Sequence, residues 1–185
     1  MIVRGPPSGA GAEPSPLYDL IELFFFAYRD FTADADRQLE GLGFGRAHHR
    51  VLHFVDRHPG LAVAALLDIL RITKQSLNRV MKDLIDGGFI EVRAGVSDRR
   101  RRLIHVTPKG GRLAVDLARL HSARFERALS PLPAEVRAQA VEFLLGMIDP
   151  GERDRVVELV WGARRPPGGA EAGAGWTAAP REHAA

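Results

Sequence analysis

Apolar residues between positions 63 and 87 recur at helical spacing in two short blocks. The first is an i, i+3, i+4, i+7 series, and the second repeats the same spacing; the members are Val63, Leu66, Leu67 and Leu70, then Leu77, Val80, Met81, Leu84 and Ile85. Arg71 and Ile72 leave only a tight link, and the Thr73 hydroxyl can accept hydrogen bonds from the first-turn amides of the second helix. The pattern predicts a helix-turn-helix.

The second helix, in the stretch from Thr73 to Gly87, also presents a polar face. That face contains no acidic residue before Asp83. Amide and cationic side chains suit the acceptor-rich edges of bases and the phosphates of DNA. We therefore expect DNA contacts from this face, through Thr73, Lys74, Gln75, Ser76, Asn78, Arg79 and Lys82.

A β-hairpin is predicted directly after this helix. Residues 89–93 alternate like a strand, residues 103–106 form its partner, and the connection A-G-V-S-D-R-R-R-R places four consecutive arginines at the tip. Residues 71–112 hold eleven Lys or Arg against four Asp or Glu, a net of +7 in a chain whose total is +3. Such an excess is often only a solvated surface, but beside a helix-turn-helix it indicates a surface that neutralises phosphates.

A long, aromatic-rich helix is predicted from Leu17 to Leu39. One side of this helix is apolar and consists of Leu17, Leu20, Ile21, Phe24, Tyr28 and Phe31. The apolar surface continues around the helix through Leu23, Phe25 and Phe26. This is more than one small core can cover, so the pattern favours packing against a second copy. The glycines of Gly41–Gly45 then form a turn and not a dinucleotide-binding loop, because no strand precedes them.

Further helices are predicted on both sides of this region. Arg46 to Arg57 is helical, and Thr107 with Pro108 begins a long helix that continues to about Leu129. Residues 134–148 form an amphipathic helix whose expected buried residues are Val136, Ala140, Val141, Leu144, Leu145 and Ile148. The apolar residues Val156, Val157, Leu159, Val160 and Trp161 are expected to extend this final helix.

A helix-turn-helix followed by a basic hairpin is a winged helix, and residues 17–148 resemble the MarR family of bacterial transcriptional regulators. The most specific part is D-R-R-R-R-L-I-H-V-T-P-K-G, which is similar to the family's wing sequence through Asp98, Arg100, Thr107 and Gly110. Ala62 departs from the family, many of whose members cap the third helix with Ser or Thr.

The resemblance implies a mainly α fold with a small β-hairpin wing, dimerising through its N- and C-terminal helices. The expected layout is a winged-helix domain at 16–161, with a DNA-binding lobe at 46–107, dimerisation helices at 16–40 and 108–161, and disordered tails at 1–15 and 162–185. Two recognition helices related by a two-fold axis would bind a pseudo-palindromic operator with half-sites roughly ten base pairs apart.

The resemblance also assigns roles at the DNA. It implies that the helix face already described lies in the major groove and that Arg100 enters the minor groove, with Arg99 and Arg101 beside it. Asp98 would help to hold the hairpin in place. An arginine in the minor groove reads groove width, because a narrow groove concentrates negative potential.

Histidines are frequent just before the helix-turn-helix. His49 and His53 lie one turn apart, which permits a metal site, but this spacing is common in helices, and no metal is expected. The MarR family commonly binds small aromatic or anionic effectors in the seam between the dimer helices and the DNA-binding lobe. The resemblance implies a similar pocket bounded by Phe25, Tyr28, His48 and His49, and a pH response through these imidazoles is an alternative role.

Composition and missing motifs narrow the function further. The chain has no cysteine and therefore no disulfide or thiol switch, and no apolar run or secretory signal, so we expect a cytoplasmic protein without membrane contact. No arrangement of residues predicts catalysis or a cofactor. Two functions remain: a homodimeric sequence-specific regulator, or a ligand-sensing or protein-interaction module that binds DNA only weakly. The four arginines favour the regulator.

Overall fold

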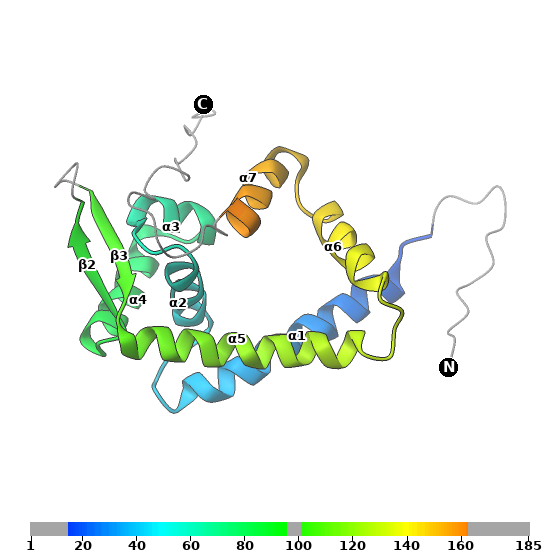
Figure 1. Cartoon of the computed structure of the whole chain (residues 1–185), viewed down its shortest axis with the longest axis horizontal. Helices are drawn as coiled ribbons and strands as arrows, with labels where there is room; N and C mark the ends of the chain where they lie inside the picture. Colours follow the sequence, from blue (N-terminus) through cyan, green and yellow to red (C-terminus); the bar gives the residue numbers. More distant parts are fainter. Residues whose placement is uncertain (1–14, 96–100, 163–185) are drawn as a thin grey trace.

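The computed structural model describes residues 15–95 and 101–162 of the chain. It is mainly helical, with one small antiparallel sheet (Figure 1). Two long helices, α1 (Tyr18–Glu40) and α5 (Pro108–Leu129), lie side by side, and the winged helix-turn-helix lies at one end of α5. The predicted fold class, mainly α with a β-hairpin wing, is confirmed.

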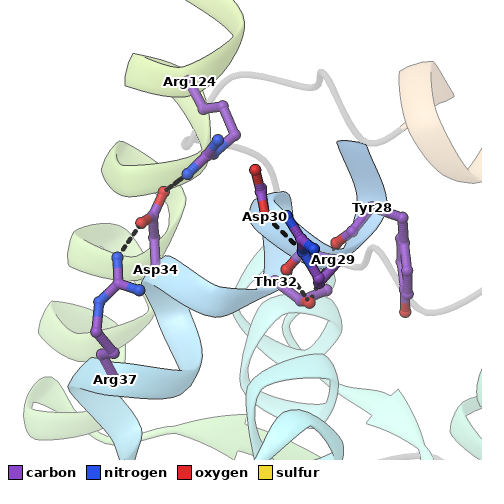
Figure 2. Close-up of polar contacts among 7 residues, drawn as sticks. All are labelled: Tyr28, Arg29, Asp30, Thr32, Asp34, Arg37 and Arg124. Carbon is purple, nitrogen blue, oxygen red and sulfur yellow. Dashed lines mark hydrogen bonds and ion pairs between the residues drawn. The ribbon is translucent and has the colours of Figure 1, made fainter. Parts of the chain in front are cut away.

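Polar and aromatic contacts fix the C-terminal half of α1 to α5. Arg124 donates from Nη2 and Nε to the Asp34 carboxylate at 2.6 and 3.0 Å, and Asp34 also pairs with Arg37 (Figure 2). The Arg124 guanidinium lowers the pKa of the Asp34 carboxyl below its usual value. Nearby, the ring of Phe31 stacks on that of His121 with centroids 3.9 Å apart. These contacts leave the N-terminal half of α1 free of the core.

Three helices form the helix-turn-helix and its support: α2 (Arg46–Arg57), α3 (Val63–Leu70) and α4 (Lys74–Asp86). The bounds of α2 and α3 are those that the apolar spacing predicts. Their inward faces bury Val51, Leu52, Val55, Leu66, Leu70, Leu77, Val80, Met81 and Leu84. Ile85, the last member of the apolar series in α4, is instead 42% exposed and lines a groove between α4 and the wing.

The wing is part of a three-stranded antiparallel sheet in the order β1-β3-β2. β2 (Ile90–Ala94) pairs with β3 (Arg102–Val106) in a register that sets Val92 opposite Ile104. A short strand β1 (Leu61–Ala62), which the sequence pattern did not predict, pairs with β3 on its other side. Ala62 also precedes α3 as its N-cap residue and makes no side-chain cap, as its departure from the family predicted.

The C-terminal helices differ from the prediction. α6 (Val136–Gly146) lies away from the winged helix (Figure 1), and none of its residues is buried, although six apolar residues of this region were predicted to be; Val141 and Leu144 are exposed. Within residues 15–95 and 101–162, no element covers this helix. The apolar residues after position 155 do not extend α6 either. α6 ends at Gly146, and a separate segment begins with the turn at Pro150 and Gly151.

That segment returns to α3 (Figure 1). It consists of a 3-10 turn (Pro150–Glu152), α7 (Arg153–Val157) and a π-helical turn (Glu158–Gly162).

The N-terminal half of α1 carries an exposed apolar face. Phe25 is 62% exposed, and the other exposed large apolar residues of this half are Tyr18, Leu20, Ile21, Leu23, Phe24, Phe26 and Tyr28. Phe125 near the C-terminal end of α5, Phe143 in α6 and Met147 directly after α6 are exposed as well. Contiguous apolar surface of this kind usually marks an interface with another chain.

Candidate nucleic-acid interface

The polar face of α4 points away from the core. Lys74, Gln75, Ser76, Asn78, Arg79 and Lys82 are all exposed, while the opposite face of the helix is buried. Thr73 caps the helix as predicted: its Oγ1 accepts from the Ser76 amide at 3.1 Å. The packed face and the cap therefore fix the orientation in which the polar face is presented.

A histidine of α2 contacts α4. His48 Nδ1 accepts from the Gly45 amide at 3.1 Å, so its Nε2 carries the proton and donates to Asp83 of α4 at 3.2 Å. His48 also stacks on Phe44, with ring centroids 4.6 Å apart. This histidine, expected at an effector pocket, thus contacts α4 directly, and nothing in the sequence signals its contact with Asp83.

A groove of about 990 Å³ separates α4 from the wing. Apolar residues of α3, α4 and β2 form its floor, including Val63, Leu67, Met81 and Val92. Lys74, Asn78 and Lys82 line it from α4, and Arg101 and Arg102 line it from the wing. Four cations therefore surround the groove, with Asp86 as the opposing acid, paired to Lys82. This arrangement suits a polyanionic strand that passes between helix and wing.

The wing presents its described arginines to solvent. Arg101 and Arg102 are exposed, and Gly95 donates its amide to the Arg101 carbonyl at 2.9 Å, which closes the described part of the hairpin. On β2, Arg93 pairs with Glu91. The other expected DNA contacts of the wing, Asp98, Arg99 and Arg100, lie outside the described residues.

The wing is locked to α4 and α5 by the two remaining motif residues. Thr107 Oγ1 accepts from the Gly110 amide at 3.1 Å, which caps α5, and donates to the Gly88 carbonyl at 2.7 Å. Gly110 approaches the strand so closely that an added Cβ would lie 1.9 Å from the Phe89 carbonyl oxygen. The spacing of Thr107 and Gly110 is thus explained by packing: one residue joins three elements, and the other leaves room for them.

The four residues of the expected effector pocket have different neighbours. Tyr28 lies on the exposed half of α1 with its ring directed away from the Asp34–Arg124 pair (Figure 2), and Phe25 is exposed on the same helix. His48 contacts α4, as described above. His49 instead contacts α5, where its ring centroid lies 4.9 Å from that of His121.

A histidine cluster lies in the seam between α1, α2 and α5. It consists of His49, His53 and His121, with Phe31 stacked on His121. Burial, His121 and His53 lower the pKa of His49 to about 4, while Asp36 opposes this shift. Burial likewise lowers the pKa of His121. The sequence gives no signal for His121 and Phe31, because the cluster joins three helices that are far apart along the chain.

Searches for other kinds of site were negative over the part of the chain that the structure describes. Residues 15–95 and 101–162 hold no group of three or more His, Cys, Asp or Glu side chains arranged to bind a metal ion. Within the same two ranges, no helix combines the length and the apolar character needed to span a bilayer.

A capped, exposed recognition helix beside an arginine-bearing hairpin defines a winged helix-turn-helix DNA-binding protein. The chain belongs to the MarR family of transcriptional regulators. The model of the MarR family matches residues 42–101. The HTH-type transcriptional regulator PetP of Rhodobacter capsulatus is 46% identical over 133 residues, which cover 72% of this chain and 80% of PetP.

Solved structures share the fold at lower identity. The S. aureus MepR–DNA complex aligns with a TM-score of 0.57 and 19% identity, over 72% of this chain and 97% of MepR. CouR from Rhodococcus jostii RHA1, bound to p-coumaroyl-CoA, aligns with a TM-score of 0.59 and 20% identity, over 71% of this chain and 93% of CouR.

Proposed function

We propose that this regulator binds a pseudo-palindromic operator as a homodimer and reads its sequence through α4. The observation that carries the proposal is the exposed polar face of α4, which holds no acidic residue before Asp83 and is held by the Thr73 cap and a buried opposite face. In this proposal Gln75 and Asn78 contact adenine edges and Arg79 contacts guanine in the major groove. The remaining contacts of this face, Thr73, Lys74, Ser76 and Lys82, are made mainly to phosphates.

The wing supplies the second set of contacts. Arg101 lines the groove beside α4, and Arg99 and Arg100 precede it in the sequence. We place these arginines at the minor groove, with Asp98 supporting the hairpin. A relative of the same fold has been captured on DNA, the MepR complex, which supports DNA as the partner here.

The homodimer follows from the apolar surface that the single chain leaves exposed. The N-terminal half of α1, the end of α5 and α6 together expose large apolar side chains that a second copy would cover. We therefore assign residues 16–40 and 108–161 to dimerisation and residues 46–107 to DNA binding. Two recognition helices would then contact half-sites roughly ten base pairs apart. Such a regulator acts where the DNA is, in the cytoplasm.

A small-molecule effector would act in the seam between the dimer helices and the DNA-binding lobe. CouR, which shares the fold, has been solved with p-coumaroyl-CoA, and this supports a ligand-responsive member of the fold. We propose a small aromatic or anionic effector there. The candidate contacts remain Phe25, Tyr28, His48 and His49, of which His48 contacts Asp83 of α4 and His49 contacts His121 of α5.

The decisive experiment selects bound duplexes from a random-sequence library with the purified protein at near-physiological salt. A recovered palindrome with half-sites one helical turn apart would establish a dimeric, sequence-specific regulator. Recovery of no motif, with all binding lost as salt is raised, would leave only electrostatic attraction. That outcome would favour the ligand-sensing or protein-interaction module instead.

A further inference from the structure

Four side chains of alternating charge join the C-terminal segment, residues 149–162, to α3. Asp68 pairs with Arg155, Arg155 Nη1 lies 3.6 Å from Glu152 Oε2, and the same Glu152 oxygen lies 3.2 Å from Arg71 Nη2. We refer to these residues as the ion-pair chain. It sums to zero charge, and the Asp68 and Arg155 side chains are only 28% and 23% exposed. Solvent and salt therefore screen the Asp68–Arg155 pair less than an isolated surface pair, whereas Arg71, whose side chain is 66% exposed, is the more screened end of the chain.

Apolar contacts accompany the ion-pair chain. A groove of about 410 Å³ lies between the C-terminal segment and the helices that it faces. Phe54 of α2 and Ile69 of α3 line one side, and Val156 and Leu159 line the other. The segment is also braced internally, because Arg153 donates to the carbonyl of Ile148 at 3.3 Å.

The ion-pair chain ends at the turn of the helix-turn-helix. Arg71 terminates α3 in the left-handed conformation, with φ of 49°, two residues before the Thr73 cap of α4. From the other side, Arg50 of α2 donates to the Leu70 carbonyl at 2.9 Å. The turn that sets the direction of α4 is thus held by α2 on one side and by the C-terminal segment on the other.

We propose that Asp68 and Arg71 are positioning residues through which the C-terminal segment sets the orientation of the recognition helix. The inference rests on the proposed function, in which α4 contacts the bases. Specific binding requires α4 to lie in one orientation, whereas attraction to phosphates does not. Loss of the ion-pair chain therefore weakens operator binding while leaving non-specific binding intact.

Substitution of the two acids separates positioning from simple electrostatics. Glu152→Gln and Asp68→Asn each remove a negative charge, which by itself leaves DNA binding unchanged or makes it tighter. Positioning has the opposite sign, and we expect operator affinity about threefold to tenfold weaker, with affinity for random duplex unchanged or higher. The matched control is Asp116→Asn on α5, whose partner Arg119 lies 3.1 Å away, and it should not weaken operator binding.

A charge exchange provides the second test. In the Glu152→Gln background, where position 152 carries no charge to repel a new carboxylate, Asp68→Arg combined with Arg155→Asp restores an opposite-charge pair at the same place. Operator affinity should then recover relative to either single exchange in that background. Thermal unfolding and light scattering on each variant establish that fold and assembly are retained, and Glu152→Gln serves alone if the Asp68 variants do not fold.

Operator binding as tight as wild type in both acid variants would overturn the inference. Failure of the wild-type protein to select any sequence would overturn the proposed function as well.

Discussion

In the proposed function, single side chains on α4 decide base preference. Gln75 and Asn78 are exposed on a helix whose other face is buried, so truncating either leaves the core intact. Gln75→Ala or Asn78→Ala should cost roughly 1 to 3 kcal/mol of binding free energy on the operator and relax the preference at one base pair. Titration of matched operator and single-base variants measures both effects. If the two variants bind all sequences as wild type does, the major-groove assignment fails.

The close packing of α5 against the backbone before β2 depends on Gly110. A Cβ at position 110 would lie 1.9 Å from the Phe89 carbonyl oxygen, a backbone atom that cannot turn aside. Gly110→Ala should therefore lower the free energy of unfolding by at least about 2 kcal/mol. Gly146, at the end of α6, has no neighbouring atom within 4 Å of such a Cβ, so Gly146→Ala is the control. Equal urea-unfolding midpoints for the two variants would contradict the packing argument.

At the scale of elements, the sequence predicted the features that depend on residues close together in the chain, such as helix bounds and helix caps. The bounds of α2 and α3 and the Thr73 and Thr107 caps follow from apolar spacing and cap chemistry. The two-residue strand β1 could not be predicted, because it exists only by pairing with β3. For the same reason the His48–Asp83 contact was missed, since neither residue marks its partner in the sequence. The burial predicted for α6 was wrong because an amphipathic pattern does not say which chain covers it.

The seam between α1, α2 and α5 gives the protein a pH-dependent stability. His49 has its pKa lowered to about 4, first by burial and then by His121 and His53, against about 6.5 in an unfolded chain. The unfolded state thus binds the proton first, so the stabilisation is fully present above pH 6.5 and is lost as the pH falls towards 4.

The size of this effect is measurable against a variant. Between pH 7 and pH 4.5 the wild-type protein should lose about 1 to 2 kcal/mol of unfolding free energy through His49, less than the full pKa shift implies because solvent reaches part of the ring. His49→Gln should lose correspondingly less over the same range, because its side chain does not titrate. Urea unfolding at the two pH values gives the difference directly. Parallel losses in both proteins would show that His49 is not the group responsible.

At the scale of the whole molecule, the proposed palindromic operator requires a dimer, and the apolar face of α1 is the surface proposed to form it. A single recognition helix contacts only one half-site, and tight binding to a palindrome needs two helices held at a fixed spacing. The exposed face of α1, together with the uncovered α6, is the surface on which that spacing depends in our proposal. Disruption of this face should therefore remove operator binding without touching any DNA contact.

Phe24→Asp on α1 tests this connection. Phe24 is 49% exposed in the single chain, so a charge there should leave the fold intact yet place an unpaired carboxylate in the dimer interface. We expect the dimer dissociation constant to rise at least about 100-fold, and the variant to bind a full palindrome no more tightly than a half-site. Light scattering and titration with the two duplexes measure the two effects.

The control for this experiment carries the same chemical change elsewhere. Leu42 is 45% exposed in the turn between α1 and α2, and Leu42→Asp should leave assembly and operator affinity as in wild type. A Phe24→Asp protein that remains dimeric would move the interface away from α1. If the variant is monomeric but still binds the palindrome more tightly than the half-site, dimerisation in solution is not required for operator recognition.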